Sequence, residues 1–149
     1  MLGEGESEFS NGVHLLKYCT WEINEATCMA KTDACTKGLA FWYPTLDLGF
    51  MSPTPYETLA TRINFYEALA ILSVLEDART HFPPDSKIVI YSDNFTTVAM
   101  FNSLRCLPEY NCILKAAVDI LIKSDFSLWV LHIARLNNVQ AAGTAALDD

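Results

Sequence analysis

Three acidic residues stand at positions where exposure to water does not explain them. Asp33 follows Lys-Thr in a largely apolar segment, Glu67 lies inside the apolar run Phe65–Leu72, and Asp93 directly follows Ile-Val-Ile-Tyr-Ser. A lone buried carboxylate is costly, and carboxylates gathered in one cleft repel one another. A divalent cation between them would offset that repulsion, and hard oxygen ligands favour Mg²⁺ or Mn²⁺. The three acids are therefore candidate metal ligands.

Each acid also has an ordinary structural interpretation. Asp93 could cap the helix that follows it, because Asp and Asn are favoured at helix N-caps. Glu67 could pair with Arg62 or face solvent, and Asp33 could belong to the turn before Gly38. Only the combination of the three favours a site.

The elements that must position these acids follow from the pattern of apolar residues. We expect strands at 27–34, 38–43, 48–51, 87–92 and 126–133, and helices at 63–82, 94–104 and 109–123. The apolar run at 87–92 is typical of a central strand covered on both faces. A short helix over 13–23 and a last helix starting near Asn137 or Asn138 complete the order β-β-β-α-β-α-α-β-α.

Composition places the chain among globular proteins. Its 149 residues are 51% hydrophobic and 19% charged, which suits one domain with a single core. We expect a lead-in with a short helix at 1–26 and the folded domain at 27–149. No apolar stretch reaches the roughly 18 residues needed to span a bilayer, and the N-terminus is acidic, so we expect an intracellular protein without a membrane partner.

The five cysteines are odd in number and form no CxxC pair. Neither a disulfide framework nor a zinc site is therefore indicated. We expect reduced, buried cysteines that behave as small apolar residues.

Several short motifs occur in one order along the chain. Residues 32–38, Thr-Asp-Ala-Cys-Thr-Lys-Gly, are similar to T/S-D-A-S-x-x-G; residues 63–70 are similar to I-x-x-x-E-x-x-A, and residues 91–94 to Y-T/S-D-N. Residues 100–104 and 131–133 continue the pattern. Together, over roughly residues 27 to 142, they resemble the ribonuclease H-like domain of fungal retrotransposon reverse transcriptase polyproteins.

This resemblance implies a ribonuclease H-like α/β fold, with a mixed five-stranded sheet flanked by helices. It implies that Asp33, Glu67 and Asp93 are catalytic and hold Mg²⁺ or Mn²⁺. The implied substrate is an RNA–DNA hybrid, contacted by Asn94 and Asn138, and an adjoining reverse transcriptase domain is an implied partner.

The resemblance further implies a catalytic role for His132, which assists proton transfer or product departure from a mobile segment. A histidine that closes an apolar strand is more often a packed or surface residue. The three tryptophans could stack on bases, although in strands and helices they are more often core residues.

The last motif departs from the family pattern H-x-P-G-x-x-N-x-x-A-D. His132 and Asn138 match, but Ala142 replaces the final Asp, which is the fourth acid of the metal site. Asp148 and Asp149 follow six and seven residues later, which is about 9 to 10.5 Å farther along a helix. Neither can therefore substitute for the missing carboxylate.

Two functions compete, and the three retained acids favour the first. One is a ribonuclease H-type endonuclease that cleaves the RNA strand of RNA–DNA hybrids by two-metal catalysis, impaired by loss of the fourth acid. The other is a catalytically dead, domesticated retroelement domain that acts as a structural or protein-binding module. The net charge of −8 means that an adjoining domain would have to supply most affinity for nucleic acid. A transposase or integrase ranks last, because those enzymes place their Glu after the second Asp.

Overall fold

One mixed sheet of five strands forms the centre of the computed structural model, which describes residues 21–35, 38–53 and 63–134. The strand order across the sheet is β3-β2-β1-β4-β5. The elements in chain order are the 3₁₀ turn η2 (Ile23–Glu25), β1 (Cys28–Ala34), β2 (Gly38–Tyr43), β3 (Leu48–Pro53), α2 (Ile63–His81), β4 (Lys87–Ser92), α3 (Phe95–Ser103), the 3₁₀ turn η4 (Pro108–Tyr110), α4 (Asn111–Ser124) and β5 (Ser127–His132). The predicted order of strands and helices is confirmed over these residues.

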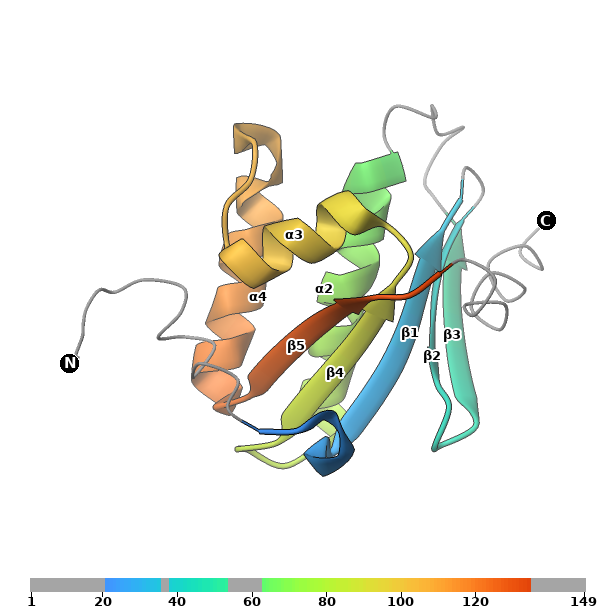
Figure 1. Cartoon of the computed structure of the whole chain (residues 1–149), viewed down its shortest axis with the longest axis vertical. Helices are drawn as coiled ribbons and strands as arrows, with labels where there is room; N and C mark the ends of the chain where they lie inside the picture. Colours follow the sequence, from blue (N-terminus) through green and yellow to red (C-terminus); the bar gives the residue numbers. More distant parts are fainter. Residues whose placement is uncertain (1–20, 36–37, 54–62, 135–149) are drawn as a thin grey trace.

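The directions of the strands decide where a site can form. β1 runs antiparallel to β2 and parallel to β4, and β4 runs parallel to β5. Helix α2 connects β3 at one edge of the sheet to β4 near its middle and packs against β1 (Figure 1). The carboxyl ends of β1, β4 and β5 therefore lie along the same end of the sheet, where side chains from all three strands can meet.

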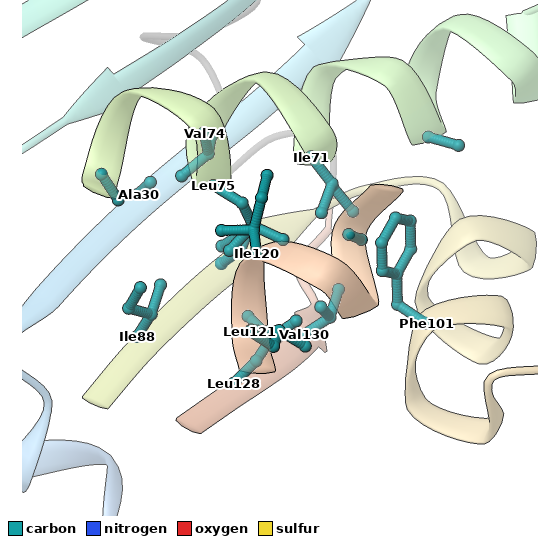
Figure 2. Packing of buried hydrophobic residues seen from close by; sticks show 14 of the residues in the cluster. Ala30, Ile71, Val74, Leu75, Ile88, Phe101, Ile120, Leu121, Leu128 and Val130 are labelled. Atoms are coloured by element: carbon teal, nitrogen blue, oxygen red, sulfur yellow. The ribbon is translucent and has the colours of Figure 1, made fainter. Parts of the chain in front are cut away.

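The hydrophobic core lies between the sheet and the helices. Side chains of α2 and α4 meet those of β4 and β5, as Figure 2 shows for Leu75, Ile120, Ile88 and Val130. Complete burial of one such side chain contributes about 1.5–3 kcal/mol. Small residues on α2, such as Ala68, are completely buried and let the helix approach the sheet closely. This packing fixes the start of α2 relative to β1.

Strand β4 is buried on both faces, as its apolar sequence predicts. Ile88, Val89 and Ile90 are all completely buried, and successive side chains of a strand point to opposite faces. Trp129, which pairs with Val89 in the strand register, packs against Trp21 with the ring planes tilted by 32° and the centroids 5.5 Å apart. Trp21 is itself buried. It therefore belongs to the core.

The ends of the helices differ slightly from the predicted ones, for identifiable reasons. Helix α3 begins at Phe95 because Asn94 is its N-cap, with Oδ1 accepting a 2.8 Å hydrogen bond from the Thr97 N–H. It ends where Leu104 adopts a left-handed conformation, with φ of 55°. Helix α4 begins at Asn111, two residues later than predicted, because residues 108–110 form a 3₁₀ turn that starts at a proline.

Both predicted terminal helices fall wholly or partly outside the described residues. Of the helix expected at 13–23, only residues 21–23 are described, and there the prediction is wrong, because Ile23 starts a 3₁₀ turn. The helix expected from Asn137 or Asn138 lies entirely outside them. No helix in the described part of the chain is long and apolar enough to cross a membrane.

The prediction of uniformly buried cysteines is wrong. Cys28 is buried, but Cys35 and Cys106 are partly exposed and Cys112 is exposed. All four are free thiols. The last two flank η4: Cys106 packs against the core but stays partly exposed, and Cys112 faces solvent near the start of α4.

Candidate metal centre

The three predicted acids converge. One oxygen atom each from Asp33, Glu67 and Asp93 lies within 4.8 Å of the others. Ligands on opposite sides of one cation, each about 2.0 to 2.6 Å from it, are separated by about 4 to 5 Å. Three carboxylates at this spacing form a hard, anionic donor set of the kind that Mg²⁺ and Mn²⁺ prefer. The residues present therefore fit such an ion.

Two neighbouring parallel strands and one helix bring the acids together. Thr32 of β1 lies opposite Ser92 of β4 in the strand register, and the next residue of each chain segment is one of the aspartates. Glu67 is the fifth residue of α2 and is 2% exposed, while Asp33 is 1% exposed. Asp93 is partly exposed. Asp33 and Glu67 therefore form the buried side of the site, and the site is open to solvent beside Asp93.

Three of the ordinary interpretations of the acids do not agree with the structure, and one stays untested. Asn94, and not Asp93, caps α3. Glu67 is buried and does not face solvent, and Arg62, its other suggested partner, lies outside the described residues. Asp33 lies within β1 and not in the turn that follows. What the three acids share is their position in one cluster.

Asn94 has a structural role that the sequence did not reveal. Its Oδ1 accepts hydrogen bonds of 2.8 Å from both the N–H and the hydroxyl of Thr97, and its Nδ2 donates one of 2.7 Å to Asn64 Oδ1. The side chain thus organises the start of α3. Its predicted role in binding substrate remains a prediction.

Asn64 is a candidate functional residue that sequence reasoning missed. It precedes Glu67 by three residues on α2, and residues three apart on a helix share a face. Its oxygen accepts from Asn94, while its amide nitrogen donates no hydrogen bond within the described part of the chain. That nitrogen can donate to a ligand beside the acids. The spacing relative to Glu67 was the signal that could have identified it.

His132 lies beside the acids, at the end of β5. It pairs in register with Ser92, the residue before Asp93, and is exposed. Its imidazole makes an edge-to-face contact with Phe95, with ring centroids 5.6 Å apart and planes at 78°. The family resemblance implies that this histidine lies on a mobile segment, but here His132 is the last residue of a paired strand. Asn138 and Ala142 lie outside the described residues.

An open, largely apolar cavity of about 620 Å³ adjoins this site. Helix α3 and the segment that leads into η4 form most of its wall, with Asn64 and Phe95 on the wall as well. Arg105 supplies a positive charge. The cavity is lined by Asn64, Phe95, Thr96, Ala99, Met100, Ser103, Arg105, Cys106, Leu107 and Tyr110.

Positive charge is scarce on the described surface. Arg79, Lys87 and Lys123 each form an exposed ion pair with a nearby acid. Such pairs contribute little to stability, about 0 to 1 kcal/mol each, but they reduce the charge available to a phosphate. Arg105 and Lys115 have no ion-pair partner within the described residues. Arg105 is therefore the unpaired cation on the cavity wall.

Comparison with solved structures identifies the fold. The chain is similar to LC11-RNase H1 in complex with RNA/DNA hybrid, with 16% identity and a TM-score of 0.65 over 78% of this chain and 92% of the other. It is also similar to RNase H1 from the halophilic archaeon Halobacterium salinarum NRC-1, with 17% identity and a TM-score of 0.63 over 82% and 98% of the two chains.

A third similar structure is the N-terminal RNase H domain of a Mycobacterium tuberculosis protein fused to maltose binding protein, with 13% identity and a TM-score of 0.60 over 78% and 93%. No family model and no curated protein matches the sequence. The chain therefore has the ribonuclease H-like fold, with three clustered carboxylates at the end of the sheet where β1 and β4 terminate.

Proposed function

We propose that this protein is a ribonuclease H-type endonuclease that cleaves the RNA strand of RNA–DNA hybrids with Mg²⁺ or Mn²⁺, and that its activity is weakened by the absence of a fourth acid. The observation that carries the proposal is the convergence of Asp33, Glu67 and Asp93 within 4.8 Å. The fold supports it, because one structure with the same fold is an RNase H1 bound to an RNA/DNA hybrid.

Asp33, Glu67 and Asp93 would hold the metal. A divalent ion bound there supplies an activated water and stabilises the charge that develops on the leaving oxygen. The burial of Asp33 and Glu67 excludes water from one side of the site. The partly exposed Asp93 stands where the scissile phosphate can approach.

The other polar groups of the site would act on the substrate directly. The Asn64 amide can donate a hydrogen bond to a ribose 2′-hydroxyl, which is the group that distinguishes RNA from DNA. The exposed imidazole of His132 can carry a proton at the solvent side of the site or assist the departure of product. The apolar cavity with Arg105 offers a surface to the paired DNA strand, with one cation for a phosphate.

Two features predict weak activity of the isolated chain. Ala142 stands where the resemblance expects the fourth carboxylate, so a second cation would lack one ligand. The net charge of −8 opposes the approach of phosphates. An adjoining polymerase domain, such as the reverse transcriptase of a retroelement polyprotein, would supply the missing affinity.

The alternative is a catalytically inactive domain that serves as a structural or protein-binding module. The replacement of the fourth acid by Ala142 and the acidic composition favour it. Under this alternative the acid cluster is a remnant, and the protein needs no metal affinity.

A cleavage assay on end-labelled RNA distinguishes the two. The wild type should cleave RNA in an RNA–DNA hybrid, but not in single-stranded form, when Mn²⁺ or Mg²⁺ is present, and Asp93→Asn should abolish cleavage. Asp119→Asn is the matched control, because Asp119 is an exposed acid on α4 that pairs with Lys123. Absence of cleavage by the wild type in both metals, at low salt and high enzyme concentration, supports the inactive module.

A further inference from the structure

Phe95 is an exposed aromatic residue at the border of the metal centre. Its side chain is 71% exposed, although it lies only two residues after Asp93. The ring contacts His132 edge to face at a centroid distance of 5.6 Å, which is within the range preferred by aromatic pairs. A phenylalanine in this position leaves apolar surface in water while it covers one face or edge of an imidazole.

Hydrogen bonds between helix α3 and strand β5 hold Phe95 in contact with His132. The Asn102 side chain donates a 2.8 Å hydrogen bond from Nδ2 to the Val130 carbonyl, and its Oδ1 accepts one of 3.4 Å from the Val130 N–H. At the other end of the helix, Asn94 caps the first turn. The position of Phe95 over His132 is thus set by a helix that is anchored near both ends.

The His132 imidazole has little else to orient it. Its backbone is fixed, because it pairs with Ser92 and the following Ile133 N–H donates a 3.0 Å hydrogen bond to the Ser92 carbonyl. Its ring is exposed and makes no hydrogen bond or ion pair within the described residues. Contact with Phe95 is therefore the interaction that can select one orientation of the imidazole.

We propose that Phe95 is a positioning residue that holds the His132 imidazole beside Asp33, Glu67 and Asp93. The inference rests on the proposed hybrid-cleaving function and adds to it. Phe95 acts through His132, so its loss lowers the rate of turnover. Arg105 and the rest of the cavity wall remain to bind the hybrid, so KM changes less than kcat.

The test is a double-mutant cycle on kcat and KM for hybrid cleavage in Mn²⁺. Phe95→Leu removes the aromatic ring at similar size and should lower kcat about 2- to 10-fold, the factor that corresponds to one aromatic pair. Phe95→Tyr keeps an aromatic ring at this position and should retain most of the wild-type kcat. In a His132→Ala background, Phe95→Leu should have no further effect, because the two residues act as one unit.

A spectroscopic measurement tests the contact without activity. In ¹H–¹³C spectra of the full chain, the His132 ring protons should carry a ring-current shift that is lost in Phe95→Leu and kept in Phe95→Tyr. Leu107→Ala is the matched control, because Leu107 is an exposed residue of the same cavity. This control should leave the His132 signals in place.

Four results would overturn the inference. A rise in KM with unchanged kcat in Phe95→Leu makes Phe95 a nucleic-acid contact. An undiminished effect of Phe95→Leu in the His132→Ala background shows that Phe95 acts independently. If the wild type cleaves no hybrid, the proposed function falls together with the rate effect. If the wild type cleaves and Phe95→Leu has the same kcat and KM, only this inference is overturned.

Discussion

Asn94 Nδ2 donates a 2.7 Å hydrogen bond to Asn64 Oδ1, which joins the start of α3 to the first turn of α2. The two helices carry different parts of the site: α2 bears Glu67, and α3 bears Phe95. The bond links residues 30 positions apart in sequence. The amide pair therefore ties the helix that bears Glu67 to the residue that directly follows Asp93.

Replacement of Asn94 should therefore destabilise the protein in two separable steps. Asn94→Ser keeps an N-cap oxygen but is too short to reach Asn64, whereas Asn94→Ala removes the cap as well. Loss of an N-cap side chain costs about 0.5 to 2 kcal/mol, so the free energy of unfolding should fall in the order wild type, Ser, Ala. Urea denaturation measures it. Lys115→Ala, at an exposed position of α4 with no ion-pair partner within the described residues, should change stability by about 0.5 kcal/mol or less.

Divalent metal should raise the melting temperature of the wild type. A ligand that binds only the folded state stabilises it by mass action, by about 2.7 kcal/mol at 100 times the dissociation constant. Asp93→Asn removes one of the three clustered carboxylates and should reduce the shift, while Asp119→Asn should not. Differential scanning fluorimetry with Mg²⁺, Mn²⁺ and EDTA makes the comparison. Identical curves for the wild type and Asp93→Asn in every condition would argue against a metal centre.

Introduction of an acid at position 142 should raise hybrid cleavage. The reason is that Ala142→Asp supplies the carboxylate that the family motif carries and this chain lacks. The gain should disappear in the double variant with Asp33→Asn, because the added acid acts only on a metal held by the others. The measurement is the initial rate with Mn²⁺ at low salt. If the unmodified chain cleaves the hybrid as fast as Ala142→Asp does, the alanine at position 142 does not weaken activity.

The cysteines should differ sharply in reactivity. Burial raises the pKa of the Cys28 thiol to about 12, and the nearby Asp77 carboxylate adds to the rise. Only the thiolate reacts with iodoacetamide, and at pH 8 about one molecule in 10⁴ would carry it at Cys28. The exposed Cys112 should be alkylated within minutes and Cys28 only after unfolding. Peptide mass spectrometry over a time course tests this; equal rates would contradict the burial of Cys28.

Much of the fold could be predicted because apolar patterning and helix-ending prolines are local signals. The run at 87–92 identified the interior strand β4, and Pro83 and Pro84 bounded α2 to within one residue. The convergence of the three acids was also predictable, since the carboxyl ends of neighbouring parallel strands meet at one end of a sheet. The sequence did not predict individual side-chain hydrogen bonds between elements that are far apart along the chain.

The two asparagine contacts illustrate that limit. The bonds of Asn94 to Asn64 and of Asn102 to Val130 join elements that are 30 and 28 residues apart. An exposed or half-exposed asparagine on a helix gives no local sign of its partner, because its amide can bond to water equally well. These contacts became visible only once the helices were placed.

The bonds of Asn102 have a consequence for the behaviour of the protein in concentrated solution. β5 is an edge strand, and an edge strand offers unused N–H and C=O groups to which another chain can add. The Asn102 amide engages both groups of Val130 and so imitates one residue of a sixth strand. A strand from another chain would first have to displace the Asn102 amide before it could pair with β5 at Val130. This side chain therefore opposes edge-to-edge aggregation.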